Sequence, residues 1–69
     1  MSQEIRNKLA YNVERLRSKN NVKREELSLL LGFDNSYISK LEKGKVNITI
    51  DKIAKIATYF GVEPYKLIK

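Results

Sequence analysis

The chain has 69 residues, of which 14 are Lys or Arg and 8 are Asp or Glu, so its net charge is +6. This length allows one small domain, residues 1–69, with a marginal core, because so short a chain buries only about 60% of its unfolded surface. Cys and His are absent. Their absence excludes disulfides and thiolate metal sites, and it removes the usual general base and thiol nucleophile. We therefore expect no enzyme, no metal and no cofactor.

The positive charge favours a polyanionic partner, although solubility alone also accounts for such an excess. The N-terminal segment MSQEIRNKLAYN is charged throughout and lacks the apolar run of a signal peptide. No window approaches the roughly 18 apolar residues of a membrane span. The sequence thus predicts a soluble, cytoplasmic protein.

A first amphipathic helix is predicted from about Ser2 or Gln3 to Lys19. Its apolar residues recur every three or four positions and so share one face: Ile5, Leu9, Val13 and Leu16. Asn20 and Asn21 end it, since Asn tolerates the left-handed conformation that closes helices.

Two short helices hinged at Gly32 are predicted next. The first runs from about Arg24 to Leu31 and turns Leu27 and Leu31 inward. Gly32 ends it by supplying a positive φ.

Asp34 is then expected to cap a third helix, from about Asn35 to Lys43, by accepting a hydrogen bond from an amide in its first turn. Ile38 and Leu41 give this helix a buried face, and Gly44 follows it. Two helices in this order form a helix-turn-helix, whose second helix is small enough to enter the major groove of DNA. DNA binding is therefore the first functional hypothesis.

Thr49 is predicted to cap a fourth helix, which ends at Gly61. Its apolar stripe comprises Ile50, Ile53, Ile56, Ala57 and Phe60. Pro64 suits the first turn of a short fifth helix. Without strand-like alternation, the fold is expected to be all-α.

These residues resemble the phage-repressor family, the Cro and lambda-repressor-like DNA-binding domains. The similarity runs from about Leu9 to Ile68, and its most specific part is SYISKLEKGK at 36–45. Restriction-modification controller proteins look particularly similar, through Tyr-Ile-Ser at 37–39 and the helix start at 47–50. The resemblance implies a five-helix lambda-repressor-like domain with the helix-turn-helix at helices two and three. One departure is Lys23, since the family usually places a capping Ser or Thr there.

The resemblance also implies roles for individual residues, beside the plainer alternative of a solvated polar face. Base contacts fall to Asn35, Ser36, Ser39 and Lys40, and DNA backbone contacts to Arg24, Tyr37, Lys43, Lys45 and Asn47. For Tyr37, core packing is an equal alternative. A partly buried ion pair between Arg17 and Glu42 is expected to orient the third helix.

Two apolar groups exceed what the helices need for their own packing. Leu29 and Leu30 either pack under the first or fourth helix or form a contact patch. The C-terminal group is expected to form a dimer interface: Phe60, Val62, Tyr65, Leu67 and Ile68. The predicted function is a transcriptional regulator that binds a pseudo-palindromic operator as a homodimer. The alternatives are a protein-interaction module, such as an antitoxin or antirepressor partner, and the DNA-binding part of a longer chain.

Overall fold

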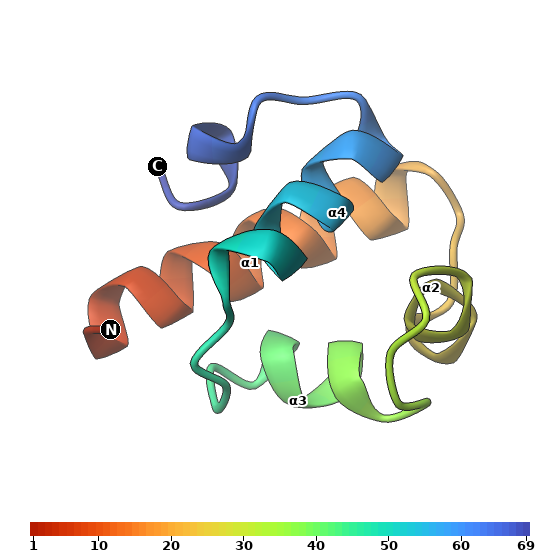
Figure 1. The fold of residues 1–69 in the computed structure, drawn as a ribbon, viewed down its shortest axis with the longest axis horizontal. Helices are drawn as coiled ribbons and strands as arrows, with labels where there is room; N and C mark the ends of the chain where they lie inside the picture. The colour runs from red at the N-terminus through yellow and green to blue at the C-terminus, as the bar shows by residue number, and fades with distance from the viewer.

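The computed structural model describes all 69 residues as four α-helices and one 3₁₀ turn. The elements are α1 (Gln3–Lys19), α2 (Arg24–Leu30), α3 (Tyr37–Glu42), α4 (Ile50–Phe60) and η1 (Pro64–Leu67) (Figure 1). The expected all-α class is confirmed, but the fifth α-helix is wrong. Four residues from Pro64 form a 3₁₀ turn, in which the Lys66 amide donates to the Glu63 carbonyl at 3.0 Å.

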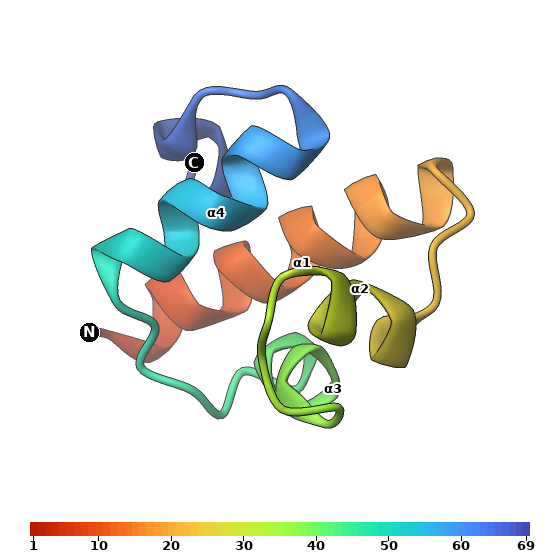
Figure 2. The same cartoon turned by 45° about the vertical axis from the view of Figure 1, so that its right-hand side comes forward.

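The elements enclose one apolar core. In Figure 1, α3 lies below α1 and α4, and the turned view of Figure 2 shows α2 and α3 adjacent to one another. α3 packs against α1 and α2, whereas η1 packs against α1 and α4. The core side chains come from every element and the loops between them: Leu9, Val13, Val22, Leu27, Ile38, Leu41, Ile48, Ile53, Ile56, Ala57 and Leu67.

Local signals set the ends of α1 and α4 as expected. The Ser2 hydroxyl accepts from the Ile5 amide at 3.2 Å, and the Thr49 hydroxyl accepts from the Lys52 amide at 3.2 Å. Asn21 follows α1 with φ 55°, the left-handed conformation predicted for the Asn pair. The bounds of α1, the Thr49 cap and the closing Asn pair were predicted, because each depends on residues within one turn of a helix end; the Ser2 cap was not predicted.

The turn between α2 and α3 differs from the prediction. α2 ends at Leu30, and α3 begins only at Tyr37, so Asn35 and Ser36 lie in the turn rather than in the helix. The expected Asp34 side-chain cap is wrong. The Tyr37 amide instead donates to the backbone carbonyl of Asp34 at 3.0 Å, which closes a turn and leaves the carboxylate exposed.

The exposure of side chains decides three further expectations about burial. Ile50 is 83% exposed and is not part of the apolar stripe of α4, because it is the first residue of that helix and points away from the core. Leu29 and Leu30 are 60% and 59% exposed, so they do not pack under α1 or α4. Leu67 is fully buried in the core of the monomer, which removes it from any exposed interface.

None of the helices has both the length and the apolar character needed to span a bilayer.

Candidate nucleic-acid interface

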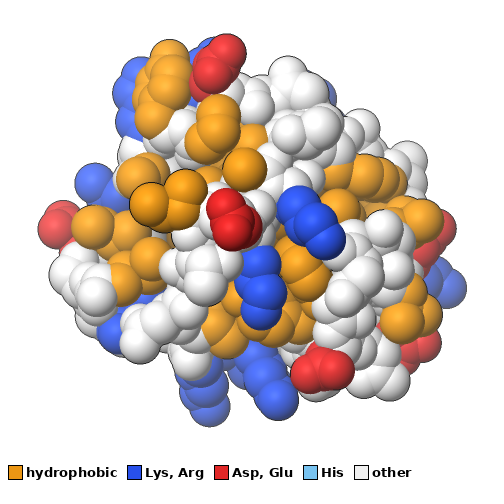
Figure 3. All heavy atoms as spheres, viewed as in Figure 1, with side chains coloured by type: hydrophobic (Ala, Val, Ile, Leu, Met, Phe, Trp, Pro, Cys, Tyr) orange, Lys and Arg blue, Asp and Glu red, His pale blue; other side chains and the backbone are white.

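α3 has one apolar face and one polar face. Ile38 and Leu41 are buried, whereas Asn35 and Lys40 are exposed and Ser36 and Ser39 are half-buried. In the space-filling view two basic side chains project from the lower edge of the molecule, beneath α3 (Figure 3). The four residues expected to contact bases therefore lie on or directly before this short helix. Ammonium groups can donate hydrogen bonds to base edges in the major groove, and amide and hydroxyl groups can both donate and accept them.

The first turn of α3 is anchored by a side chain from α2. The fully buried Ser28 hydroxyl accepts a hydrogen bond from the Ile38 amide at 3.1 Å and donates one to the Arg24 carbonyl at 3.0 Å. It therefore satisfies an amide that has no partner within α3 itself. Ser28 therefore links α2 directly to the first turn of α3.

The other end of α3 is held by two arginines. Arg17 Nε lies 2.7 Å from Glu42 Oε2, and Arg17 Nη1 donates to the Val22 carbonyl at 2.8 Å. The Glu42 side chain is 3% exposed and the Arg17 side chain 12%. The structure therefore brings this expected pair together and largely buries it from solvent. Arg24 adds a second pair, from its Nε to Glu42 Oε1 at 2.8 Å.

Arg24 was expected to contact the DNA backbone. Its side chain is 50% exposed, and the one bond to Glu42 uses only Nε. The Nη groups of its guanidinium remain able to donate to a phosphate.

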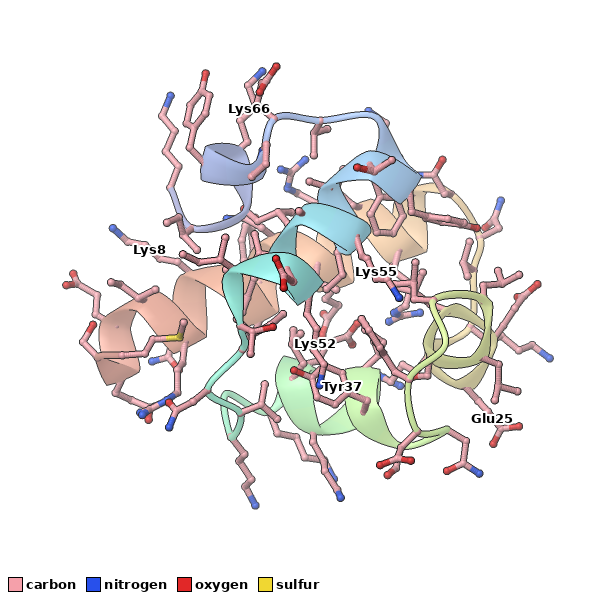
Figure 4. All side chains as sticks on the ribbon, viewed as in Figure 1. Lys8, Glu25, Tyr37, Lys52, Lys55 and Lys66 are labelled. Carbon is pink, nitrogen blue, oxygen red and sulfur yellow. The ribbon has the colours of Figure 1, made fainter.

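Tyr37 packs rather than projecting into solvent. Its ring lies 4.9 Å from that of Phe33, and Lys52 Nζ of α4 lies 4.5 Å from the Tyr37 ring centroid (Figure 4). Burial raises the pKa of the Tyr37 phenol above its usual value. Lys55 Nζ donates to the Leu31 carbonyl at 3.2 Å, so two lysines of α4 contact the α2–α3 turn.

Three further expected backbone contacts lie at the end of α3 and in the loop that follows. Lys43, Lys45 and Asn47 are all exposed. The Asn47 amide oxygen already accepts from Arg6 of α1, at 2.9 Å from Nε and 2.6 Å from Nη2. Its amide nitrogen is therefore the group that would meet a phosphate.

The C-terminal residues expected at the dimer interface differ in their exposure to solvent. Tyr65 is 56% exposed and Ile68 37%, while Phe60 and Val62 are half-buried against the core. Leu67 is buried beneath them, and its carbonyl accepts from the Asn12 amide nitrogen at 2.8 Å. The expected dimer surface thus keeps two exposed side chains and two partly exposed ones.

Ser28, Asn12, Arg6 and Lys52 were not singled out by the sequence. For Ser28 a signal exists, because it follows Leu27 and precedes Leu31 by three positions, which places it on the inward side of α2. For Arg6 and Lys52 none exists, since their partners lie 41 and 15 residues away along the chain. Such contacts depend on how the helices cross.

A short helix with a buried apolar face and an exposed polar one, braced by a second helix and followed by a basic loop, defines a helix-turn-helix DNA-binding domain. The chain belongs to the helix-turn-helix domain family, whose match covers residues 10–69. This is a family of DNA-binding regulators of transcription.

Three known proteins are similar to this chain over most of its length. A hypothetical transcription factor from Neisseria meningitidis is 36% identical over 96% of the chain, which spans 62% of that relative's length. Control protein C.BamHI from Bacillus amyloliquefaciens is 35% identical over 99% of the chain and 85% of its own length. The crystal structure of the restriction-modification controller protein C.AhdI from Aeromonas hydrophila aligns with a TM-score of 0.83 and 31% identity, over 94% of each chain. The expected similarity to controller proteins is confirmed.

Proposed function

We propose that the chain is a sequence-specific transcriptional regulator that binds a pseudo-palindromic operator as a symmetric homodimer. The observation that carries the proposal is the exposed polar surface of α3 and of the turn before it: Lys40 on the helix and Asn35 in the turn are exposed, whereas Ile38 and Leu41 are buried. With a net charge of +6, the chain is also attracted to DNA of any sequence.

The two groups of side chains have different roles in this proposal. Asn35, Ser36, Ser39 and Lys40 read base edges, since Asn matches adenine and Lys matches guanine in the major groove. Exposed basic and amide groups from the flanking segments bind phosphates and set the register: Arg24, Lys43, Lys45 and Asn47. Tyr37 has a packing role, which its contacts with Phe33 and Lys52 support.

A dimer is proposed because one short helix reads only about four base pairs, which is too few for useful specificity. A twofold pair places two such helices about 34 Å apart, one turn of DNA. Tyr65 and Ile68 would form the centre of the contact, with Phe60 and Val62 at its edge. Dimerisation would also add apolar burial to a chain with a small core.

The likeness to C.BamHI and C.AhdI supports a controller of a restriction-modification system as the particular role. Regulation by protein concentration follows from a dimer that must assemble before it binds both half-sites.

Selection of bound sequences from a random DNA pool tests specificity and symmetry together. A pseudo-palindrome with half-sites one turn apart is the expected outcome. Lys40→Ala should then weaken binding to that operator by about 1–3 kcal/mol and leave unrelated DNA almost unaffected. Lys45→Ala, the matched control, should weaken both and reduce the salt slope by about one. A pool that yields no preferred sequence contradicts the proposal.

The dimer has its own test in sedimentation at micromolar concentration. Tyr65→Glu and Ile68→Glu should each give a folded monomer with greatly reduced operator affinity, because two independent half-sites lose their effective concentration. A wild-type chain that is monomeric and binds one half-site as tightly as two contradicts the symmetric mechanism.

One observation favours a second candidate, a protein-interaction module. The outer side of α2 exposes Leu29 and Leu30, and Figure 4 shows Glu25 projecting outward from the same helix. Leu30 also lines an open groove of about 350 Å³ together with Leu31, Ala54 and Thr58. Salt separates the candidates, since DNA binding weakens steeply as salt rises and an apolar contact does not.

A further inference from the structure

We propose that Gln3 and Arg6, at the start of α1, are positioning residues for DNA binding: together they hold the α3–α4 loop in its binding shape before DNA arrives. We call these two side chains the α1 clamp. The inference rests on the proposed function, because the loop matters only if its basic residues contact DNA.

The loop between Gly44 and Thr49 has little structure of its own. No regular element covers residues 45–49, and the backbone amides of 46–48 donate to no backbone carbonyl. The buried Ile48 and the half-buried Val46 pack against the core and hold two points of this segment. The polar part of the loop, at Gly44 and Asn47, is held by side chains of α1.

The α1 clamp provides that restraint through bonds between segments 41 residues apart. Gln3 Nε2 donates to the Gly44 carbonyl at 3.0 Å, at one end of the loop. Arg6 donates to Asn47 Oδ1 through both Nε and Nη2, at 2.9 and 2.6 Å, in its middle. Arg6 Nη1 also donates to Gln3 Oε1 at 3.0 Å, so the two clamp residues brace one another.

Gly44 permits the close approach of the clamp. Its φ is +71°, which side chains rarely adopt, and a Cβ there would lie 2.9 Å from Asn7 Oδ1 and 3.0 Å from Gln3 Nε2. The same glycine that ends α3 therefore also makes room for α1 against the loop.

The clamp leaves the charge of Arg6 uncompensated. All its acceptors are neutral amide oxygens, and no carboxylate lies in an ion pair with it. The Arg6 guanidinium therefore holds Asn47, in the loop that also carries Lys45, without being neutralised. Its principal effect is preorganisation, because a loop that is already ordered loses less entropy on binding.

Two clamp variants keep the net charge, and they provide the test. Gln3→Ala removes the bonds to Gly44 and Arg6, and Arg6→Lys removes the forked contact with Asn47. Ser18→Ala, at an exposed site on the far end of α1, is the control. Each is measured by amide hydrogen exchange of residues 45–48, by the urea midpoint and by operator affinity at several salt concentrations.

We expect faster exchange in the loop, a nearly unchanged urea midpoint and about three- to tenfold weaker operator binding with an unchanged salt slope. Lys45→Ala should also lose less affinity in the Gln3→Ala background than in the wild type, because a disordered loop presents that lysine less effectively. The control variant should match the wild type in every measurement.

The outcomes separate the clamp from the function on which it rests. Unchanged loop exchange, or altered exchange with wild-type DNA affinity, overturns the clamp while the wild type still binds its operator. A salt slope reduced by about one in Arg6→Gln would make Arg6 a phosphate contact rather than a positioning residue. A wild-type chain without salt-dependent DNA binding overturns the proposed function itself.

Discussion

Two elements, α3 and the C-terminal η1, are attached to the rest of the molecule by different sets of interactions. α3 buries Ile38 and Leu41 in the core and is held in addition by directional polar bonds: Ser28 at its first turn, and Glu42 with Arg17 and Arg24 at its end. The C-terminal η1 is attached mainly by burial of Leu67, with a single polar bond from Asn12. Apolar burial supplies stability but little angular precision, whereas hydrogen bonds fix orientation. The element proposed to read DNA therefore has more polar bonds to fix its orientation than η1 has.

Leu67→Ala should produce the largest loss of stability, about 3–5 kcal/mol, because it leaves a cavity in a small core. Urea unfolding measures it, with the exposed Leu29→Ala as the control, where about 0.5 kcal/mol or less is expected. A loss at Leu67 no larger than at Leu29 would mean that η1 does not belong to the cooperative core.

Arg17→Ala should cost about 2–3 kcal/mol, since it leaves the buried Glu42 carboxylate with Arg24 alone. Arg24→Ala should cost about 1 kcal/mol or less, because that side chain is half exposed. A double-mutant cycle of Arg17→Ala with Glu42→Gln measures the coupling. Additive effects would show that the pair contributes nothing to the attachment of α3.

Ser28→Ala should cost about 1–2 kcal/mol, because the buried Ile38 amide loses its partner. If the bond orients α3, operator affinity should fall further than stability explains. Binding measured well below the unfolding midpoint makes that comparison, with Ser18→Ala as the reference. Loss of stability with full operator affinity would limit Ser28 to a packing role.

Tyr37→Phe should change the free energy of unfolding least. We expect its effect only at alkaline pH. The folded-state pKa of the phenol lies above its unfolded value, so folding favours the neutral form. The wild type should therefore lose stability as pH rises from the unfolded pKa through the folded one, relative to Tyr37→Phe. Urea midpoints of both proteins at neutral and alkaline pH measure the difference. If the urea midpoints of both proteins depend on pH in the same way, the phenol hydroxyl of Tyr37 is not desolvated.

Periodicity and local capping were enough to predict much of the fold. The bounds of α1, the buried positions Leu9, Val13, Ile53 and Ile56, and the cap at Thr49 depend on residues within one or two turns, and the structure has them where the sequence indicates. The polar face of α3 was likewise predicted from the burial of Ile38 and Leu41. These features depend on interactions between residues that are close together in the chain, and such interactions can be inferred directly from the sequence.

The sequence by itself determined the four α-helices, their order and the helix-turn-helix; the tertiary structure decided the 3₁₀ form of the last turn and the partners of individual side chains. Asp34 had the chemistry of a cap, yet its backbone carbonyl accepts from the Tyr37 amide, and Ser28 from another helix accepts from the Ile38 amide. Leu67 is as apolar as Leu30, yet one lies in the core and the other faces solvent. Arg6 and Asn47 meet across 41 residues. Such contacts depend on the crossing of helices, which follows from packing of the whole core and from no single segment of the chain.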